Sequence, residues 1–395
     1  MDRTPRFIDI HVVQPIPYAN LNRDDTNSVK TMLYGDALRT RISSQSWKRA
    51  IREHFQDALG DSALRTRRIG ERVAEVLRGR GWDKELADRA GAHVAAGSSI
   101  KWEVAKGKDK QPITNKVLTN ALVYLPEDAV EELADIAEAH KDAITVDFTG
   151  KEKAKGKPES ALKGKIDRIL IKRNGVINLF GRMLAEIDQA DVDGAVQVAH
   201  AFTTHTTEVE LDYFAAVDDV TAARNDETGS GHMGTAEFST GTLYRFATVD
   251  LKELTKNLSD DSEIAVDAAR ELAGQFLLSF IESLPQAKKN STAPHSLPHL
   301  VHVAVRSDRP LSFAAAFEEP VRSAQHGGYV ARSVEEIDAY SHAANTLLGS
   351  DRVLHAAHAS LHFDKLEHLG ERCPSFEALV AAAAAVAVAL AEAPQ

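Results

Sequence analysis

FIDIHVV, residues 7–13, is the stretch from which the fold can be worked out. Its apolar and polar side chains alternate along the chain: Ile8, Asp9, Ile10, His11 and Val12. Alternation with a period of two is typical of a β-strand that buries one face. The segment that follows, residues 14–28, is rich in the turn-forming residues proline, asparagine and aspartate. The sequence therefore predicts a strand and then a long loop.

A helix is expected after this loop, starting within residues 41–55, RISSQSWKRAIREHF. Its apolar residues recur at helical spacing and share one face: Trp47, Ile51, Phe55 and Ala58. Hydroxyl and amide side chains stand at its start, and cations occupy its other faces. These polar residues are Ser43, Ser44, Gln45, Lys48, Arg49 and Arg52.

Cations in the first turn of a helix repel the positive end of its dipole unless an anion binds there. Phosphate oxygens can be bound by free backbone N–H groups, hydroxyl groups and positive charge. Such contacts do not depend on the identity of the base. The pattern therefore indicates a phosphate-binding helix. The alternative is an ordinary capped helix whose cations pair with nearby acids.

Composition indicates a folded chain: of its 395 residues, 43% are hydrophobic and 27% are charged. A single cysteine, Cys373, excludes an internal disulfide framework and suits a reducing cytosol. The N-terminus lacks the apolar core of a signal peptide, and the longest apolar run, Ala378 to Ala391, is too short to span a bilayer. We therefore expect a cytoplasmic protein with no membrane segment.

The net charge of -11 argues against a nucleic-acid partner, but the charge is unevenly distributed. Residues 30–54 carry a balance of +4, and residues 151–173 carry +6. Residues 207–237 carry -7. Basic surface is thus concentrated in two segments, while the acidic segment would avoid phosphate or meet a basic surface.

The rest of the chain mixes the two kinds of periodicity. Helical spacing dominates from Ser62 to His140, and the lysine-rich stretch from Lys151 predicts a mobile basic loop. Strand patterns return within residues 192–220, 240–251 and 300–305. A helix is expected at 267–284, and helices after residue 305. The fold class is therefore α+β, with a helical insertion between strands.

Two short motifs could carry other chemistry. Gly229 to Gly234, GSGHMG, fits the dinucleotide-binding pattern, but strand-like residues follow it where a helix is required. Asp218 and Asp219, with His200 and His205, could hold a divalent metal for phosphodiester hydrolysis. Because consecutive strand residues face opposite ways, solvated acids are the favoured interpretation of the aspartate pair.

Histidine triplets suggest zinc, but neither triplet is complete. Pro294 and Pro298 would break a helix carrying the first triplet, which is His295, His299 and His302. The second triplet shares a helical face, yet no acid or cysteine completes it: His355, His358 and His362. We expect no metal, no cofactor and no catalytic triad.

Several segments, in order, are similar to the motifs of a known family: NLNRDDTNSVK, RISSQSWKRAIRE, SALRT, GRM, DVDGAVQVAHAFTTH, DYFAAVDDV, GHMGTAEFSTGTLYRFATVDL and QAKKN. The sequence closely resembles CasC, the repeated backbone subunit of the type I-E CRISPR Cascade complex. The resemblance covers Phe7 to Arg65 and Gly181 to Leu251 well, and Gln286 to Arg322 more loosely. It departs from the family in a longer acidic segment, TAARNDETGSG, and in Asn290.

The resemblance implies an RRM-like (ferredoxin-like) palm, a helical finger insertion and an extended β thumb. The implied boundaries are 1–60 for the first part of the palm, 61–173 for the finger, 174–202 for the second palm part, 203–240 for the thumb, and 241–395 for the third palm part with C-terminal helices.

The resemblance also implies a non-catalytic subunit that stacks with further copies along a CRISPR guide RNA. It would present the guide to target DNA together with other Cascade subunits, in antiviral defence. The implied RNA contacts are Lys30, the helix from Ser43, Lys288, Lys289 and Arg322, with Met183 as a wedge against a base and the thumb, including His205 and Thr206, folded over the strand.

Two other functions remain open from the sequence. One is a metal-dependent ribonuclease that uses Asp218 and His205, and the other is a purely protein-binding assembly subunit. In the backbone subunit that the resemblance implies, the acids of the longer segment would face solvent or a neighbouring copy, so reversing the charge of Asp226 and Glu227 is expected to weaken stacking.

Overall fold

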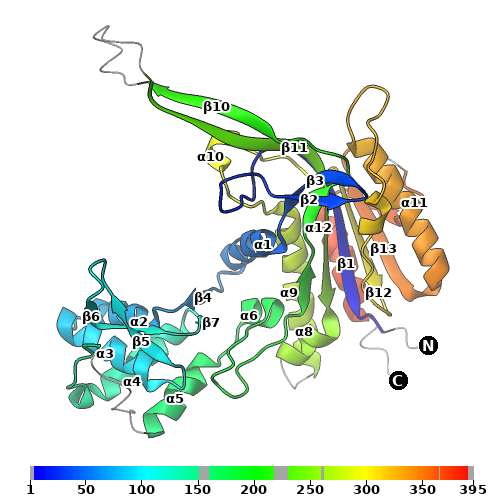
Figure 1. The fold of residues 1–395 in the computed structure, drawn as a ribbon. Coiled ribbons are helices and arrows are strands. Elements are labelled where there is room, and N and C mark those ends of the chain that lie inside the picture. The colour runs from blue at the N-terminus through cyan, green and yellow to red at the C-terminus, as the bar shows by residue number, and fades with distance from the viewer. Residues whose placement is uncertain (1–3, 151–159, 218–229, 259–261, 364, 390–395) are drawn as a thin grey trace. The chain divides into compact units, whose positions relative to one another are not determined.

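The computed structural model describes residues 4–150, 160–217, 230–258, 262–363 and 365–389 (Figure 1). The chain divides into two compact units. The sheet unit comprises residues 1–55 and 196–395, and the insert unit comprises residues 56–195. The predictions for Asp218, Asp219, Asp226, Glu227 and Gly229 concern residues outside the described part of the chain.

The sheet unit is built on a large, mostly antiparallel sheet, which agrees with the predicted α+β class. Its main strand order is β14-β13-β12-β1-β11-β9-β3-β2, and β8 and β10 also pair with β11. The strands are β1 (Phe7–Ala19), β2 (Thr31–Tyr34), β3 (Ala37–Ile42), β8 (Val196–Val198), β9 (Ala201–Thr203), β10 (Glu210–Val217), β11 (Ser230–Asp250), β12 (Leu300–Arg306), β13 (Val353–Ser360) and β14 (Glu371–Arg372). Only the β13–β14 pair is parallel among the described strands.

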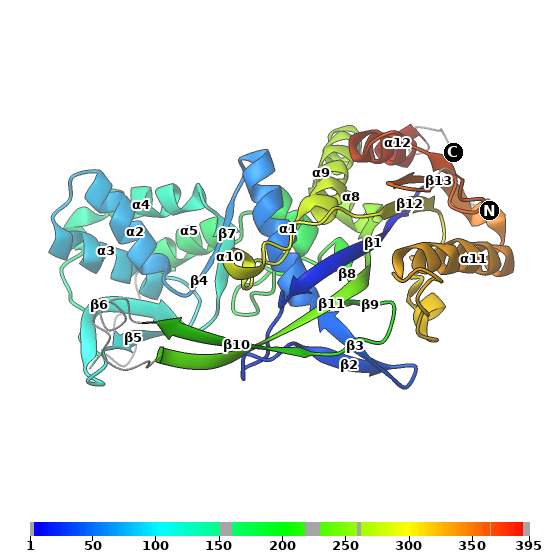
Figure 2. The same cartoon turned by 90° about the horizontal axis from the view of Figure 1, so that it is seen from above.

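Helices cover both faces of this sheet. They are α1 (Ser44–Leu59), α8 (Leu251–Leu258), α9 (Ser262–Glu282), α10 (Lys289–Thr292), α11 (Val330–Leu348) and α12 (Phe376–Ala389), with 3-10 turns η2 (Ala314–Phe317) and η3 (Ser350–Arg352). Figure 2 shows α11 on one face of β12 and β13, and α9 and α12 on the other. The predicted C-terminal helix is confirmed as α12, which packs against α9.

Strand β1 lies at the centre of the sheet, between β11 and β12. The prediction of one polar face is wrong, because Asp9 and His11 are as buried as the isoleucines beside them. Both faces are covered, so the alternating polar residues must find partners inside the protein. The Asp9 carboxylate accepts a hydrogen bond from the Leu311 N–H at 2.8 Å.

Three other local predictions need correction. Ala58 is exposed although it follows the apolar face of α1. His355 and His358 lie on β13 and not on a helix. The predicted basic loop is helical in its second half, because α5 begins at Ser160, while residues 151–159 lie outside the described chain.

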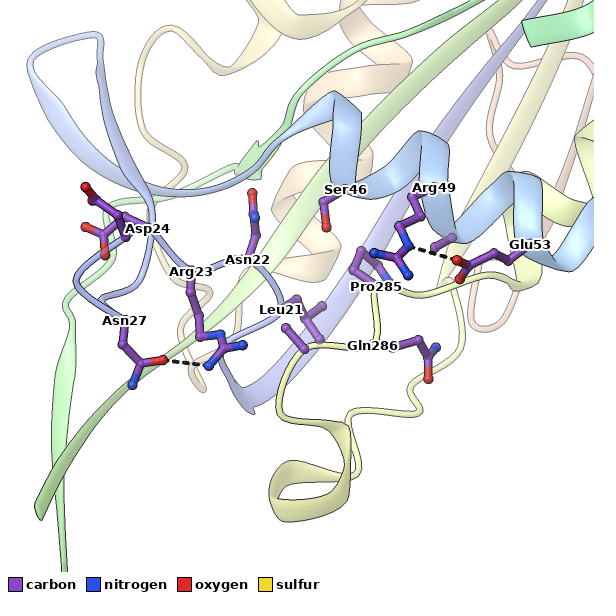
Figure 3. Close-up of a pocket in the computed structure, with 13 residues that line it drawn as sticks. Leu21, Asn22, Arg23, Asp24, Asn27, Ser46, Arg49, Glu53, Pro285 and Gln286 are labelled. Carbon is purple, nitrogen blue, oxygen red and sulfur yellow. Dashed lines mark hydrogen bonds and ion pairs between the residues drawn. The ribbon is translucent and has the colours of Figure 1, made fainter. Parts of the chain in front are cut away.

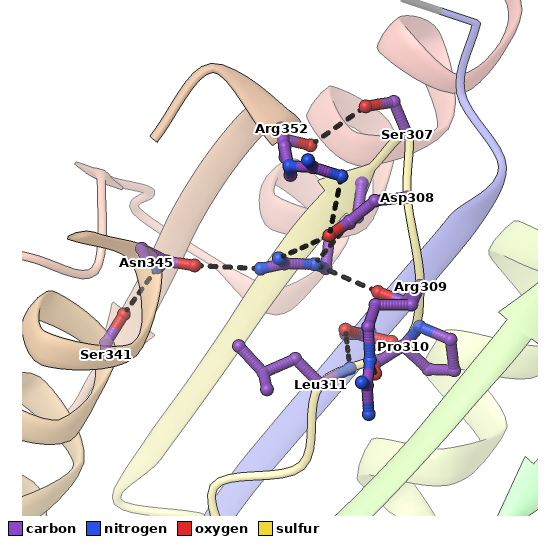
Figure 4. A network of polar contacts seen from close by, with 10 residues as sticks. Ser307, Asp308, Arg309, Pro310, Leu311, Ser341, Asn345 and Arg352 are labelled. Carbon is purple, nitrogen blue, oxygen red and sulfur yellow. Dashed lines mark hydrogen bonds and ion pairs between the residues drawn. The ribbon is translucent and has the colours of Figure 1, made fainter. Parts of the chain in front are cut away.

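A polar network ties α11 to the end of β12 (Figure 4). The buried Arg306 donates to Asp308 Oδ1 at 3.1 Å and to Asn345 Oδ1 at 2.8 Å. Ser307 Oγ donates to the Arg352 carbonyl at 3.3 Å. The guanidinium is thus both paired with a carboxylate and hydrogen-bonded, which is the condition for burying a charge.

Three buried histidines lie side by side across neighbouring strands. His11 on β1 pairs with His302 on β12, which pairs with His358 on β13. His302 Nδ1 donates to the Ala357 carbonyl at 3.0 Å, and the His11 ring stacks on Phe313 at 3.9 Å between centroids. Burial is the main cause that lowers the pKa of His302 to about 4, and His358 lowers it further.

Replacing His302 with glutamine is expected to make folding less sensitive to acid. The pKa of His302 is about 4 when folded against 6.5 ordinarily, so the folded state binds fewer protons. Relative to His302→Gln, the free energy of unfolding of the wild type should fall by about 1.4 kcal/mol for each pH unit of acidification between about pH 6 and about pH 4. Urea unfolding of both proteins at several pH values measures this difference.

Asp9 has the opposite effect on the pH dependence of stability. Burial raises the pKa of its carboxyl to about 7, so its contribution to the free energy of unfolding falls as the pH rises. Its contribution is present in both proteins and cancels in the difference. A difference in stability that does not change with pH would contradict the prediction for His302.

The insert unit has its own apolar core. Its elements are β4 (Ala63–Thr66), α2 (Ile69–Gly79), α3 (Lys84–Gly97), β5 (Trp102–Lys106), β6 (Pro112–Thr119), β7 (Val123–Pro126), α4 (Ala129–Ala139), η1 (Lys141–Ala143), α5 (Ser160–Leu170) and α6 (Gly175–Phe180). A Cβ at Gly91 would lie 2.0 Å from the Gly70 carbonyl oxygen, so α2 and α3 approach closely only because both residues are glycine. The predicted helices are confirmed, with short strand pairs between them.

Candidate nucleic-acid interface

The first turn of α1 is fixed by Ser43, which acts as its N-cap. Ser43 is 7% exposed, and its Oγ accepts a hydrogen bond from the Ser46 N–H at 3.3 Å. The Ser43 N–H in turn donates to Asn22 Oδ1 at 2.8 Å. The hydroxyl therefore satisfies one free N–H of the helix, as serine does at this position, and is used within the protein.

His200 lies against the same turn. Its Nδ1 accepts a hydrogen bond from the Ser44 N–H at 3.0 Å and lies 3.3 Å from Arg41 Nη1. Burial lowers the pKa of His200, and the charges of Arg41 and Lys30 lower it further. The fold thus gathers Lys30, Arg41 and an imidazole around the start of α1.

The cations of α1 have different surroundings. Arg49 is exposed and pairs with Glu53 at 2.8 Å, so the alternative of a locally paired cation holds for this residue. Lys48 is half-buried, and burial lowers the pKa of its ammonium group. Within the described residues, Lys30, Arg41 and Lys48 form no ion pair. Their charge remains available to an anion.

The remaining predicted residues of this helix lie on its surface. Ser44 and Arg52 are half-buried, and Gln45 is exposed. All lie on the part of α1 that belongs to the sheet unit. The structure therefore places Lys30, Ser44 and Gln45 near the start of α1, and Lys48, Arg49 and Arg52 in its second and third turns.

An open pocket of about 620 Å³ lies beside this helix (Figure 3). Its lining comes from three segments: residues 21–27, the α1 residues Ser46, Arg49, Ala50 and Glu53, and residues 285–287. Arg23 in this wall donates to Asn27 Oδ1 at 2.7 Å. The pocket brings Arg49 near the segment that leads into Lys288 and Lys289.

Lys288 and Lys289 differ in their contacts. The Lys288 backbone is left-handed, with φ 51°, and its Nζ lies 4.8 Å from the centre of the Phe238 ring on β11. Lys289, the first residue of α10, is exposed. A cation–π contact of this kind holds the ammonium group in place while leaving its charge unneutralised.

The loop before β2 is hydrogen-bonded to the root of the β10–β11 ribbon, which is the end of the ribbon at Glu210 and Glu237. The Val29 N–H donates to Glu237 Oε2, and Asn20 Nδ2 donates to the Glu237 carbonyl, both at 3.0 Å. Since Asn22 also holds the Ser43 N–H, one loop connects the start of α1 with the ribbon.

His205 is a buried residue of the sheet unit, 4% exposed. Its Nε2 accepts a hydrogen bond from the Thr242 N–H at 3.1 Å, and its Nδ1 donates to the Thr206 carbonyl at 2.8 Å. The ring stacks on Tyr329 with 3.5 Å between centroids. Both ring nitrogens are thus engaged, while the neighbouring Thr206 is exposed beside an open cavity of about 750 Å³.

Met183 and Arg322 are both exposed, in different units. Met183 belongs to the insert unit and is 84% exposed. Arg322 belongs to the sheet unit and lies 3.8 Å from Glu319.

The ribbon of β10 and β11 carries exposed apolar side chains. The register pairs Tyr213 with Thr235 and Ala215 with Met233. Because strand residues two apart share a face, Leu211, Tyr213 and Met233 lie on one face, and all three are exposed. An apolar face of this kind marks an interaction surface.

The two histidine triplets considered in the sequence are not gathered into metal-binding groups among the described residues. In the described part of the chain, no three His, Cys, Asp or Glu side chains are grouped so that they could hold a metal ion. His302 lies buried on β12, and the His299 and His362 rings meet edge to face at 5.3 Å. Among the helices that the structure describes, none has the length and apolar character needed to cross a membrane.

Comparison with known proteins identifies the family. The profile of the CT1975-like protein family matches residues 8–382. The chain belongs to the CT1975-like protein family. The resemblance to CasC backbone subunits is thereby confirmed for this CT1975-like protein.

Two solved structures are similar to this CT1975-like protein over nearly its whole length. A chain described as "CRISPR RNA-guided surveillance complex, pre-nicking" is 42% identical, with a TM-score of 0.84 over 96% of this chain and 100% of that chain. A chain described as "CRISPR RNA-guided surveillance complex" is 39% identical, with a TM-score of 0.75 over 96% and 99%. A search of curated proteins finds no match.

Sequence reasoning did not assign a site role to Arg41, and it considered His200 only as a metal ligand. Arg41 precedes the capping serine by two residues, so its place in the basic segment was a usable signal. His200 is 156 residues from Ser44, and nothing local in the sequence indicates their hydrogen bond.

Proposed function

We propose that this CT1975-like protein is a non-catalytic guide-RNA-binding subunit of a type I-E Cascade surveillance complex. Copies stack along the crRNA spacer, with other Cascade subunits, and present the guide for pairing with target DNA in cytoplasmic antiviral defence. The observation that carries the proposal is the cluster of Lys30, Arg41 and Lys48, which form no ion pair among the described residues, around the start of α1.

Backbone contacts of this kind position a nucleic acid without reading its sequence. The α1 residues, Lys30, Lys288, Lys289 and Arg322 hold phosphates in this proposal, and Met183 contacts a base. Ser43, buried as the helix cap, acts through the backbone of α1. Base pairing by the guide then supplies specificity.

The proposed domains are an RRM-like palm with a helical finger and a β thumb, in the boundaries given above. Stacking of copies is supported by the exposed apolar face of Leu211, Tyr213 and Met233 on the ribbon. The thumb, including Thr206 beside its root, folds over the RNA, and His205 supports that root from within the sheet unit.

A metal-dependent ribonuclease would degrade its bound RNA when magnesium or manganese is added, whereas the proposed non-catalytic subunit would not. Purified protein with bound guide RNA should keep that RNA intact after incubation with magnesium or manganese, as it does in EDTA. RNA length on a denaturing gel and the absorbance ratio of the size-exclusion peak measure this. Metal-dependent loss of the RNA that EDTA prevents would support the nuclease instead.

A further inference from the structure

Met183 is an exposed apolar side chain between two buried neighbours. It is 84% exposed, whereas Arg182 is 4% and Leu184 is 1% exposed. A single exposed methionine needs no explanation by itself. The backbone on both sides of Met183, however, is held in place by specific hydrogen bonds.

Arg182 fixes the backbone on the N-terminal side. Its guanidinium donates to backbone carbonyls only, among its hydrogen bonds to described residues. The acceptors and distances are Ala190 at 2.7 Å, Tyr124 at 3.1 Å, Leu170 at 3.3 Å, Ile171 at 2.7 Å and Lys172 at 2.7 Å. Three of these carbonyls close the C-terminal end of α5, where helix carbonyls lack partners and a cation is favoured.

Asp191 fixes the backbone on the C-terminal side. Its Oδ1 accepts a hydrogen bond from the Leu184 N–H at 2.5 Å. Arg182 and Val192 also exchange two backbone hydrogen bonds, at 2.9 and 2.8 Å. The turn begins at Gly181, whose φ of 79° and whose closeness to Gly194 exclude a Cβ.

We propose that Arg182 and Asp191 are positioning residues that hold Met183 as a fixed wedge against one base of the guide RNA. This inference rests on the proposed function, since it assumes a single-stranded RNA at Met183. A wedge can unstack a base only if its backbone does not yield, and the two anchors supply that rigidity. Neither anchor touches the RNA itself.

The test uses 2-aminopurine, whose fluorescence rises when it unstacks, placed at successive single positions of the guide RNA. The probe is read in complexes of the full chain. In the wild type, one position for each bound copy should fluoresce more strongly than in free RNA. Met183→Ala should reduce this increase by about fivefold.

Asp191→Ala and Arg182→Lys should reduce the same increase by a similar factor, with RNA affinity changed less than about twofold. Combining either change with Met183→Ala should add nothing further, because all three act on one wedge. Asp191 is exposed, so its variant is expected to fold even where Arg182→Lys does not. Asp188→Ala, an exposed neighbour with the same charge change, is the matched control and should behave as the wild type.

The proposal is overturned if Met183→Ala removes the signal while both anchor variants retain it. It is also overturned if Met183→Ala leaves the signal unchanged in complexes that still bind RNA, an outcome that leaves guide binding itself intact. Failure of the wild type to bind RNA would instead contradict the proposed function.

Discussion

Reversing the charge of Lys48 and Arg52 together is expected to abolish RNA-containing multimers. The two residues are four apart on α1, about one turn, and Lys48 forms no ion pair with any described residue. In the proposed function both side chains contact phosphates, so Lys48→Glu/Arg52→Glu would replace two attractions with two repulsions, and RNA affinity should fall by about 100-fold. Size-exclusion chromatography with absorbance ratios, in EDTA, measures the loss.

A matched control separates the site from the total charge of the protein. Lys252 and Arg332 are exposed on α8 and α11, away from the start of α1, and their double reversal changes the net charge equally. This control should retain the multimers. Lowering the salt should not fully rescue RNA binding by the α1 variant, and the slope of log affinity against log salt should fall by about 1.4 in that variant only. Equal binding by the α1 variant and the wild type, with unchanged circular dichroism, would assign α1 to protein contacts instead.

Replacing Arg245 with alanine is expected to destabilise the sheet unit more than other single changes discussed here. Arg245 is buried on β11, donates to Gln14 Oε1 at 2.6 Å and to the Phe280 carbonyl, and lies over the Trp47 ring at 3.9 Å. Truncation leaves a cavity and two acceptors without donors, so the free energy of unfolding should fall by about 3–5 kcal/mol.

Methionine at the same position tests the cause of this loss. Burial lowers the pKa of Arg245 to about 9, because a buried guanidinium loses its hydration and finds no carboxylate partner among the described residues. Arg245→Met fills the volume without charge and should therefore cost only about 1–2 kcal/mol. Urea unfolding followed by Trp47 fluorescence, in a background where Trp82 and Trp102 are phenylalanine, reports on the sheet unit alone. A loss below about 1 kcal/mol for the alanine variant would show that the arginine contributes little to packing.

The sequence predicted the central strand and the first helix because their signals are local. The alternation at Ile8 and Val12 and the apolar face at Trp47, Ile51 and Phe55 are contained within one element. The burial of Asp9 and His11 could not be predicted in this way. It depends on β12 and on the helices of both faces, which come from the other end of the chain.

The same limit applies to the histidines and to the site. Residues three apart, such as His355 and His358, fit a helix face, yet pairing with β12 makes them part of a strand. Positive charge near Lys48 was visible in the sequence. The imidazole of His200 against Ser44 was not, because it depends on a contact between the β8–β9 connection and the start of α1, which are far apart in the chain. The motifs of the family, in contrast, located the chain among CasC-like subunits without any structure.

The central claim is that the start of α1 and the segment around Lys289 hold the backbone of a guide RNA. Photocrosslinking of the wild-type complex, with 4-thiouridine in the guide and peptide mapping by mass spectrometry, tests it most directly. We expect crosslinks within residues 22–52 and 286–289, lost in Lys48→Glu/Arg52→Glu and retained in the Lys252→Glu/Arg332→Glu control. Crosslinks confined to other segments, unchanged by the α1 variant, would contradict it.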